Sequence, residues 1–303
     1  MSDPGEALVA FCEDAKAVKR WKAENNLGKL LGPRPPKRTK WINDMPGILL
    51  TVNNFLPQEV AESAADLLLQ VPEECWTMLS GVEGEENLDG INCAHRLHAT
   101  LGDTGLEAVD HLFELLSGVL PPAEGRHSHF HLGKFSQGDF CGVQDDAAYA
   151  LAENDEGEAV KCSRAVAVML FLTRDWEEAD GGCFKDCQQA EEKPEDTHVP
   201  VFNTLLAFHV PRLFEITKVL KSTPRMCVFG WFLQEGELYD LEHAREQPTL
   251  KELKVKKKKS KAKAAKKQAA AAAGGPPKEI VEMARKRQAA RKEGRFDEAD
   301  RIR

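Results

Sequence analysis

The sequence predicts a mainly β domain with supporting helices, followed by a basic helical tail. Three observations predict this fold class. Short apolar segments separated by turn residues fill the middle of the chain, amphipathic helical patterns precede them, and the charge changes sign near residue 250. The chain has 303 residues, of which 42% are hydrophobic, so it can bury one full core and still carry appended segments.

Helical patterns dominate the first part of the chain. Residues 1–25 have such a pattern, and the Pro-rich basic segment GKLLGPRPPKRTK cannot continue it. The segment GILLTVNNFLP predicts a strand, and PQEVAESAADLLLQV predicts a helix with one apolar stripe. A further helix is predicted over TGLEAVDHLFELLSGVL, where Thr104 and Glu107 have the spacing of a capping box.

Turn residues then divide the chain into eight predicted strands. They lie near residues 127–135, 140–144, 164–173, 182–186, 197–201, 204–210, 213–220 and 225–233. This number suits a double-stranded β-helix, the two-sheet arrangement also called a jelly roll. We therefore expect a jelly-roll domain over residues 41–245, after a helical and basic extension at residues 1–40.

The end of the chain differs from the rest in charge. Residues 251–303 contain 19 Lys and Arg against 7 Asp and Glu, whereas residues 1–250 contain 22 against 42. We expect a Lys/Ala-rich linker at 246–277 and a basic helical segment at 278–303. The linker is either simply solvated or contacts an import receptor, RNA or a ribosomal surface, and these interpretations stay open.

Composition also predicts a compartment. No apolar run reaches the roughly 20 residues that span a membrane, and the N-terminus lacks the apolar stretch of a signal peptide. We expect the protein to stay in the cytoplasm or the nucleus, without membrane contact. The eight cysteines include no CxxC pair, so free thiols are expected rather than disulfides.

Three segments carry a family resemblance: GDFCGVQDD at residues 138–146, FNTLLAFHVPRLFEITKV at 202–219, and RMCVFGWF at 225–232. In this order and spacing they resemble the core of the 2-oxoglutarate and Fe(II)-dependent dioxygenases of the prolyl 4-hydroxylase class. That family has GDxxxxHDD, then PRxHxV, then an arginine that opens a strand. The resemblance spans roughly residues 45–240 and implies the jelly roll predicted above.

The resemblance implies a site whose metal ligands have changed. In the family a His, an Asp two residues later and a distal His bind Fe(II) and leave positions open for 2-oxoglutarate. The matching positions here are Gln144, Asp146 and Phe214. A Gln amide is a far weaker iron ligand than imidazole and Phe has no lone pair, so we expect weak iron binding. Ascorbate is a further cofactor that the family implies.

Two other positions match the family's 2-oxoglutarate site. Arg225 corresponds to the arginine that forms a bidentate pair with the far carboxylate of 2-oxoglutarate. Phe135 stands where the family commonly has a tyrosine that points at this cosubstrate. Both are therefore candidate cofactor-binding residues.

Histidines elsewhere could rebuild a metal site. His127, His129 and His131 alternate along one strand and so share a face with Phe135. They either help Asp146 to hold a metal or form an ordinary sheet face. His209 lies at odd spacing from Phe214, and we expect it to point away from the site.

Three functions remain open. The first is a degenerate, inactive dioxygenase that acts as a binding module for a protein partner. The second is an active dioxygenase with unorthodox iron ligands and a protein substrate. The third is an RNA- or ribosome-associated adaptor that works through residues 251–303, since IVEMARKRQAARKEGRFDEADRIR at 280–303 resembles the C-terminal end of cysteinyl-tRNA synthetases.

Overall fold

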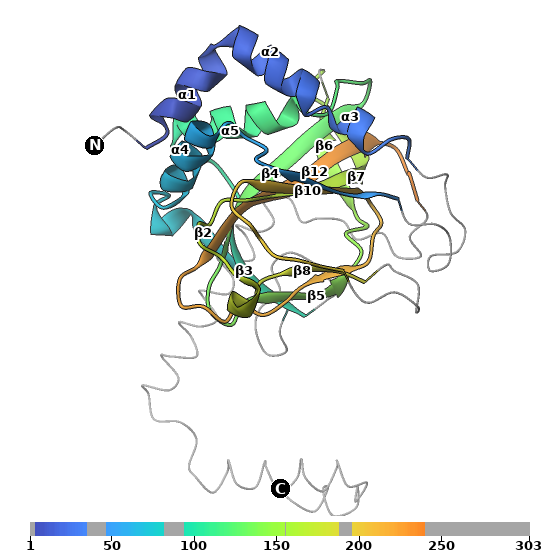
Figure 1. The fold of residues 1–303 in the computed structure, drawn as a ribbon. Helices are drawn as coiled ribbons and strands as arrows, with labels where there is room; N and C mark the ends of the chain where they lie inside the picture. Colours follow the sequence, from blue (N-terminus) through green and yellow to red (C-terminus); the bar gives the residue numbers. More distant parts are fainter. Residues whose placement is uncertain (1–3, 35–46, 82–93, 155, 188–195, 240–303) are drawn as a thin grey trace, which may run out of the picture. The chain divides into compact units, whose positions relative to one another are not determined.

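The computed structural model describes residues 4–34, 47–81, 94–154, 156–187 and 196–239 (Figure 1). The chain divides into two units, Met1–Leu250 and Lys251–Arg303. The second unit lies outside the described residues, and so do the predicted linker at 246–277 and helical segment at 278–303. The predicted start of the main domain, near residue 41, also falls outside them.

Five helices occur in the described part of the chain, and all of them end before residue 118. They are α1 (Glu6–Glu13), α2 (Ala15–Glu24), α3 (Leu27–Leu30), α4 (Gln58–Leu68) and α5 (Glu107–Ser117). Two short 3-10 turns are present: η1 (Glu73–Cys75) follows α4, and η2 (Glu178–Asp180) lies between two strands. None of these described helices has the length and apolar composition needed to cross a membrane.

The strands are mostly short and antiparallel. The first six are β1 (Leu49–Asn53), β2 (Trp76–Ser80), β3 (His95–Thr100), β4 (Arg126–Phe135), β5 (Phe140–Gln144) and β6 (Tyr149–Glu153). The others are β7 (Ala159–Phe171), β8 (Phe184–Asp186), β9 (Asp196–His198), β10 (Thr204–His209), β11 (Phe214–Ile216) and β12 (Arg225–Glu235). Among the described residues they form one curled sheet in the order β1-β10-β7-β12-β4-β3-β5-β11-β8-β9, with β2 paired to β3 and β6 to β7.

The sheet curls where β3 leaves β4. β4 pairs with β12 from Arg126 to Phe135, but with β3 only at Lys134 and Gly133, and β3 then continues to β5. Figure 1 accordingly has β4, β7, β10 and β12 close to the helices, with β3, β5 and β8 across the interior from them. The mainly β class is confirmed, and this curled antiparallel sheet is the arrangement expected of a jelly roll.

Alternation along the strands produces two hydrophobic clusters. On β12, Met226, Val228 and Phe232 face a cluster shared with the helices, whereas Cys227 and Trp231 face the interior of the curl. This alternation is the period of two that a strand imposes on its side chains. The interior side, which we call the inner face, contains the positions of the predicted site.

The N-terminal helices are part of the same core. Leu8, Trp21 and Leu27 lie in the cluster between helices and sheet, and the Trp21 indole Nε1 donates to the Phe55 carbonyl at 2.7 Å. Residues 6–30 thus pack with the sheet.

Some predicted boundaries are wrong. β11 ends at Ile216, well before residue 220, because the Thr217 hydroxyl and amide turn to hydrogen-bond the backbone of Cys183. β8 starts at Phe184 because Gly181 and Gly182 both have positive φ, 70° and 63°, which ends regular pairing. The strands β2, β3 and β6 were not predicted at all.

The predicted capping box of α5 is also wrong. The helix begins at Glu107, and its N-cap is Leu106, which makes no side-chain cap hydrogen bond. The Thr104 hydroxyl accepts instead from the Leu106 amide at 3.3 Å, so it stabilises a turn before the helix.

Candidate metal and anion site

The two positions expected for histidine face each other across a strand pair. In the antiparallel pairing of β5 with β11, Gln144 stands opposite Phe214. Side chains opposite each other in such a pair lie on the same face of the sheet. The structure thus brings together two of the three positions inferred from the sequence.

Phe214 is part of an aromatic cluster on the inner face. Its side chain is 4% exposed, its ring stacks on Phe184 at 4.9 Å between centroids, and Phe208 lies 5.4 Å away. Such contacts contribute packing energy and offer no lone pair to a metal. The residue therefore makes this side of the site apolar.

Asp146 follows β5 and is already engaged by other side chains. Its Oδ2 accepts a hydrogen bond from the Trp231 indole Nε1 at 2.9 Å, and its Oδ1 lies 3.8 Å from Arg164 Nη1. Burial raises the pKa of this carboxyl above its ordinary value, against the opposing effects of Arg164 and Trp231. Asp146 has φ of 58°, a left-handed conformation that Asp tolerates better than most residues.

Arg164 is the main residue that the sequence did not reveal. Its guanidinium lies 3.5 Å from the centre of the Trp231 ring, and its Nη1 also donates to the Asp146 carbonyl at 3.4 Å. Strict alternation along β7 would turn Arg164 toward the helices, because Val166 faces them. A bulge shifts the register, so Arg164 pairs with inward-facing Leu233 and points inward.

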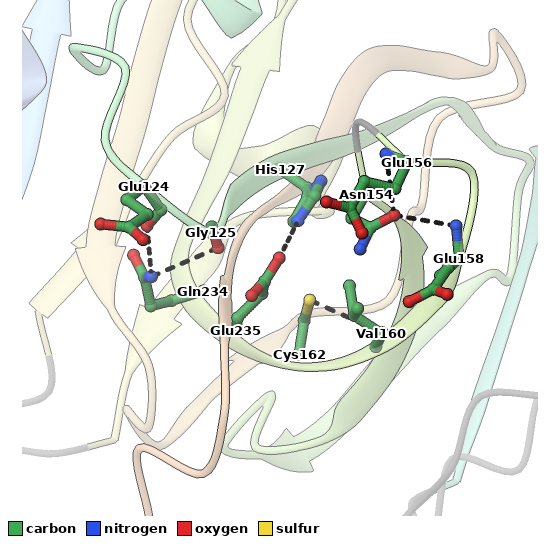
Figure 2. Close-up of polar contacts among 10 residues, drawn as sticks. All are labelled: Glu124, Gly125, His127, Asn154, Glu156, Glu158, Val160, Cys162, Gln234 and Glu235. Carbon is green, nitrogen blue, oxygen red and sulfur yellow. Dashed lines mark hydrogen bonds and ion pairs between the residues drawn. The ribbon is translucent and has the colours of Figure 1, made fainter.

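The three strand histidines share a face, as the alternation predicts, but each has other partners. His127 Nε2 lies 3.2 Å from Glu235 Oε1, near Gln234, whose amide donates to the Glu124 and Gly125 carbonyls (Figure 2). His131 Nδ1 is 2.6 Å from the Thr100 carbonyl, and the His129 ring is 4.4 Å from that of His131.

Burial keeps His131 neutral. Loss of hydration, with smaller contributions from His129 and Arg164, lowers the pKa of His131 to about 3. His209 points away as predicted, with Nε2 3.3 Å from the Gly32 carbonyl. Within the described residues, no group of three or more His, Cys, Asp or Glu side chains is placed to hold a metal ion.

Arg225 forms the second part of the site. It is fully buried at the start of β12, opposite Phe135 on β4, and its guanidinium lies 4.1 Å from the Phe135 ring centre. Nη1 donates to the Gly182 carbonyl at 2.7 Å, but Nε and Nη2 have no hydrogen-bond partner among the described residues. Burial lowers the pKa of Arg225 from its ordinary value. Two buried N–H donors of Arg225 therefore lack an acceptor among the described residues.

The glycines before β8 allow this arrangement. A Cβ atom on Gly182 would lie 3.0 Å from Val219 Cγ2 and 3.3 Å from Arg225 Cδ. A side chain here would crowd Val219 and Arg225, and the positive φ of Gly182 also favours glycine. The Thr173 hydroxyl accepts a hydrogen bond from the Met226 amide at 2.6 Å and thus fixes the start of β12.

Neighbouring residues have structural roles. Asp145 Oδ1 accepts from the Ala147 amide at 2.9 Å, which closes the turn after β5. Arg212 forms a buried bidentate ion pair with Asp186, which ties the loop before β11 to β8. Glu215 pairs with Lys185 at 3.4 Å.

These donors fit an anion better than Fe(II). One carboxylate that is already paired, one amide and one phenyl ring do not form the ligand set of an iron site. A buried guanidinium with two unused N–H groups, by contrast, matches a carboxylate. The residues present thus fit the carboxylate of 2-oxoglutarate and do not fit the metal.

Comparison with known proteins gives one family match. Residues 136–233, which contain Gln144, Asp146, Phe214 and Arg225, match the model of the 2OG-Fe(II) oxygenase superfamily. No curated protein matches the chain in sequence.

Several oxygenases are among the solved structures to which this chain shows some similarity. A Pseudomonas putida prolyl-4-hydroxylase is 18% identical with a TM-score of 0.44, over 62% of this chain and 92% of that one. A Trichoplax adhaerens prolyl hydroxylase in complex with a hypoxia inducible factor peptide is 14% identical with a TM-score of 0.48, over 73% and 94%. A Burkholderia pseudomallei oxidoreductase of the 2OG-Fe(II) oxygenase family is 14% identical with a TM-score of 0.42, over 76% and 94%.

Proposed function

We propose that this domain, whose residues 136–233 match the model of the 2OG-Fe(II) oxygenase superfamily, is a degenerate member that binds a carboxylate ligand without iron. The proposal rests on the contrast between the anion-binding part of the site and its metal-binding part. Arg225 is buried with two unused donors, whereas the metal positions hold Gln144, Phe214 and a paired Asp146. The domain then acts as a binding module.

The loss of iron follows from ligand chemistry. In this family two imidazoles and a carboxylate hold the ion, and bound iron would activate oxygen there. Here Phe214 contributes no donor, and the Asp146 oxygens already contact Trp231 and Arg164. The active-enzyme alternative needs other ligands, and among the described residues no suitable group of His, Cys, Asp or Glu exists.

Retention of the anion site follows from the cost of buried donors. Each buried N–H group without a partner costs roughly 1–3 kcal/mol. A carboxylate that accepts from Nε and Nη2 of Arg225 would remove this cost and neutralise the buried cation. The apolar rings of Phe135 and Phe171, 4.1 and 5.4 Å from the guanidinium, would strengthen such a pair by excluding water.

Calorimetric titration in the presence of a metal chelator tests the proposal. The wild-type chain should bind 2-oxoglutarate and should bind glutarate about equally well, because without a metal the keto group has no chelating role. Arg225→Gln should weaken both by about 10- to 100-fold, as expected for loss of charge-assisted hydrogen bonds. Arg20→Gln, which changes an exposed arginine of α2, should leave both unchanged.

Three results would overturn the proposal. The first is binding that needs Fe(II) and strongly favours 2-oxoglutarate over glutarate. The second is equal binding by the wild-type and Arg225→Gln chains. The third is no binding of either carboxylate with or without metal.

A further inference from the structure

We infer that the guanidinium of Arg164 takes the place of the metal ion as the positive partner of Asp146. This inference rests on the proposed function, since it explains how the site persists without iron. The Asp146 side chain is only 9% exposed and that of Arg164 only 4%, and their charged groups approach to 3.8 Å. A buried carboxylate needs a compensating charge and hydrogen bonds. Arg164 supplies the charge to Asp146, and Trp231 donates a hydrogen bond.

The position of Arg164 is built into the sheet. The bulge in β7 turns Arg164 to the inner face, opposite Leu233 of β12. Trp231, two residues earlier on β12, then lies directly beneath the guanidinium, with 3.5 Å between the cation and the ring centre. The same indole donates through Nε1 to Asp146 Oδ2. Arg164, Trp231 and Asp146 thus form one connected group, which we call the arginine–tryptophan–aspartate group.

This group opposes metal binding independently of the missing histidines. A metal ion bound to Asp146 Oδ1 would lie next to a guanidinium, and like charges at such separations repel strongly in a site with little water. Replacing Gln144 and Phe214 by histidine should therefore fail to restore a tight site while Arg164 is present.

The test compares Co(II) affinity in three variants. The double variant Gln144→His, Phe214→His has the family's three ligands but keeps Arg164. The triple variant adds Arg164→Met, which retains a long apolar side chain over Trp231. Co(II) alone is titrated, and its visible absorption and the calorimetric heat are measured. A matched control adds Arg174→Gln, which removes a cation that pairs with Glu62 and Asp66 of α4, to the double variant.

We expect the triple variant to bind Co(II) roughly 100-fold more tightly than the double variant, from loss of one nearby positive charge. The Arg174→Gln control should bind like the double variant. Equal affinity of the double and triple variants would overturn the inference but leave the proposed function intact. Tight Co(II) binding by the wild-type chain would instead contradict the proposed function.

A second measurement keeps the inference testable if the triple variant does not fold. Thermal unfolding midpoints are compared for Asp146→Asn, Arg164→Gln and their combination in the wild-type background, with and without chelator. Each single variant leaves the other partner as an uncompensated buried charge, so both should have lower unfolding midpoints than the wild-type chain. The double variant should unfold at a temperature no lower than that of the less stable single variant. Strictly additive losses, or destabilisation of the wild-type chain by the chelator, would contradict the inference.

Discussion

At the scale of single residues, Phe214 converts a polar position into part of the core. It stacks on Phe184 and contacts Phe208, so three rings occupy the side of the site opposite Gln144. The sequence motif was enough to place Gln144 and Phe214 together. The motif did not indicate that Phe184 stacks on Phe214, because this contact joins β8 to β11 and depends on where those short strands end.

Truncation of this ring measures its packing role. Phe214→Ala should lower the free energy of unfolding by about 3–5 kcal/mol, because it removes a large buried side chain and leaves a cavity. Urea unfolding followed by tryptophan fluorescence gives this quantity. Val143→Ala is a suitable control, since Val143 is 53% exposed, and it should change stability little. Similar small effects for both would show that Phe214 is not part of the core.

The neutral His131 predicts a pH dependence of stability. Its pKa is about 3 in the folded chain, against an ordinary value of 6.5. The unfolded chain therefore binds more protons between these values, and stability is lost as pH falls from 6.5 toward 3. At pH 5 the loss from this group should be roughly 2 kcal/mol.

Urea unfolding between pH 7 and pH 4.5 measures this dependence. His131→Phe should make the free energy of unfolding depend less on pH, because it removes the titrating group while keeping an aromatic ring beside Phe229 and Trp231. An unchanged pH dependence in that variant would assign the effect to other groups, such as His129.

The sequence did not reveal that Arg164 points to the inner face. Asp146 and Arg225 were found because they stand in recognisable motifs. Arg164 was missed because alternation along an apolar strand assigns it to the wrong face, and a bulge leaves no reliable mark in a single sequence.

At the scale of elements, helix ends illustrate what local sequence can predict. The Thr104 and Glu107 spacing suggested a capping box, but the chain forms a turn at Thr104 and starts α5 at Glu107. Asp14, by contrast, caps α2, since its Oδ1 accepts from the Lys16 and Ala17 amides, both at 3.0 Å. The residue types were informative, but their register needed the three-dimensional structure.

Alanine substitution should lower stability by different amounts at Asp14 and at Thr104. Asp14→Ala should destabilise the chain by about 1 kcal/mol, the usual contribution of an N-cap. Thr104→Ala should cost less, because its single 3.3 Å hydrogen bond lies outside the helix. Thermal unfolding of both variants checks the order, and a larger loss for Thr104→Ala would contradict the assigned helix start.

At the scale of the whole molecule, the chain joins segments of opposite charge. Residues 1–250 carry 22 basic and 42 acidic residues, whereas residues 251–303 carry 19 and 7. The fold class was predictable because the alternation and turn signals of the middle segment are strong. The packing of α1 and α2 into the core was not, because it depends on contacts of Leu8 and Trp21 with residues far away in sequence.

Contact of the basic segment with RNA stays a prediction. If it binds RNA, deletion of residues 251–303 should abolish binding, and the intact chain should lose affinity steeply with added salt, since phosphate contacts release counterions. Filter binding to a structured RNA at two salt concentrations measures both effects. Binding that survives the deletion would rule out this role for the segment.

The proposed function requires that this domain does not hold iron. An anaerobic titration of the purified chain with Fe(II) and 2-oxoglutarate, followed by the visible charge-transfer band of the chelated complex, tests it most directly. No saturable band should appear at iron concentrations comparable to that of the protein. A saturable band that Asp146→Ala abolishes would contradict the proposed function, because iron and 2-oxoglutarate would then bind together at the site assigned to a metal-free carboxylate module.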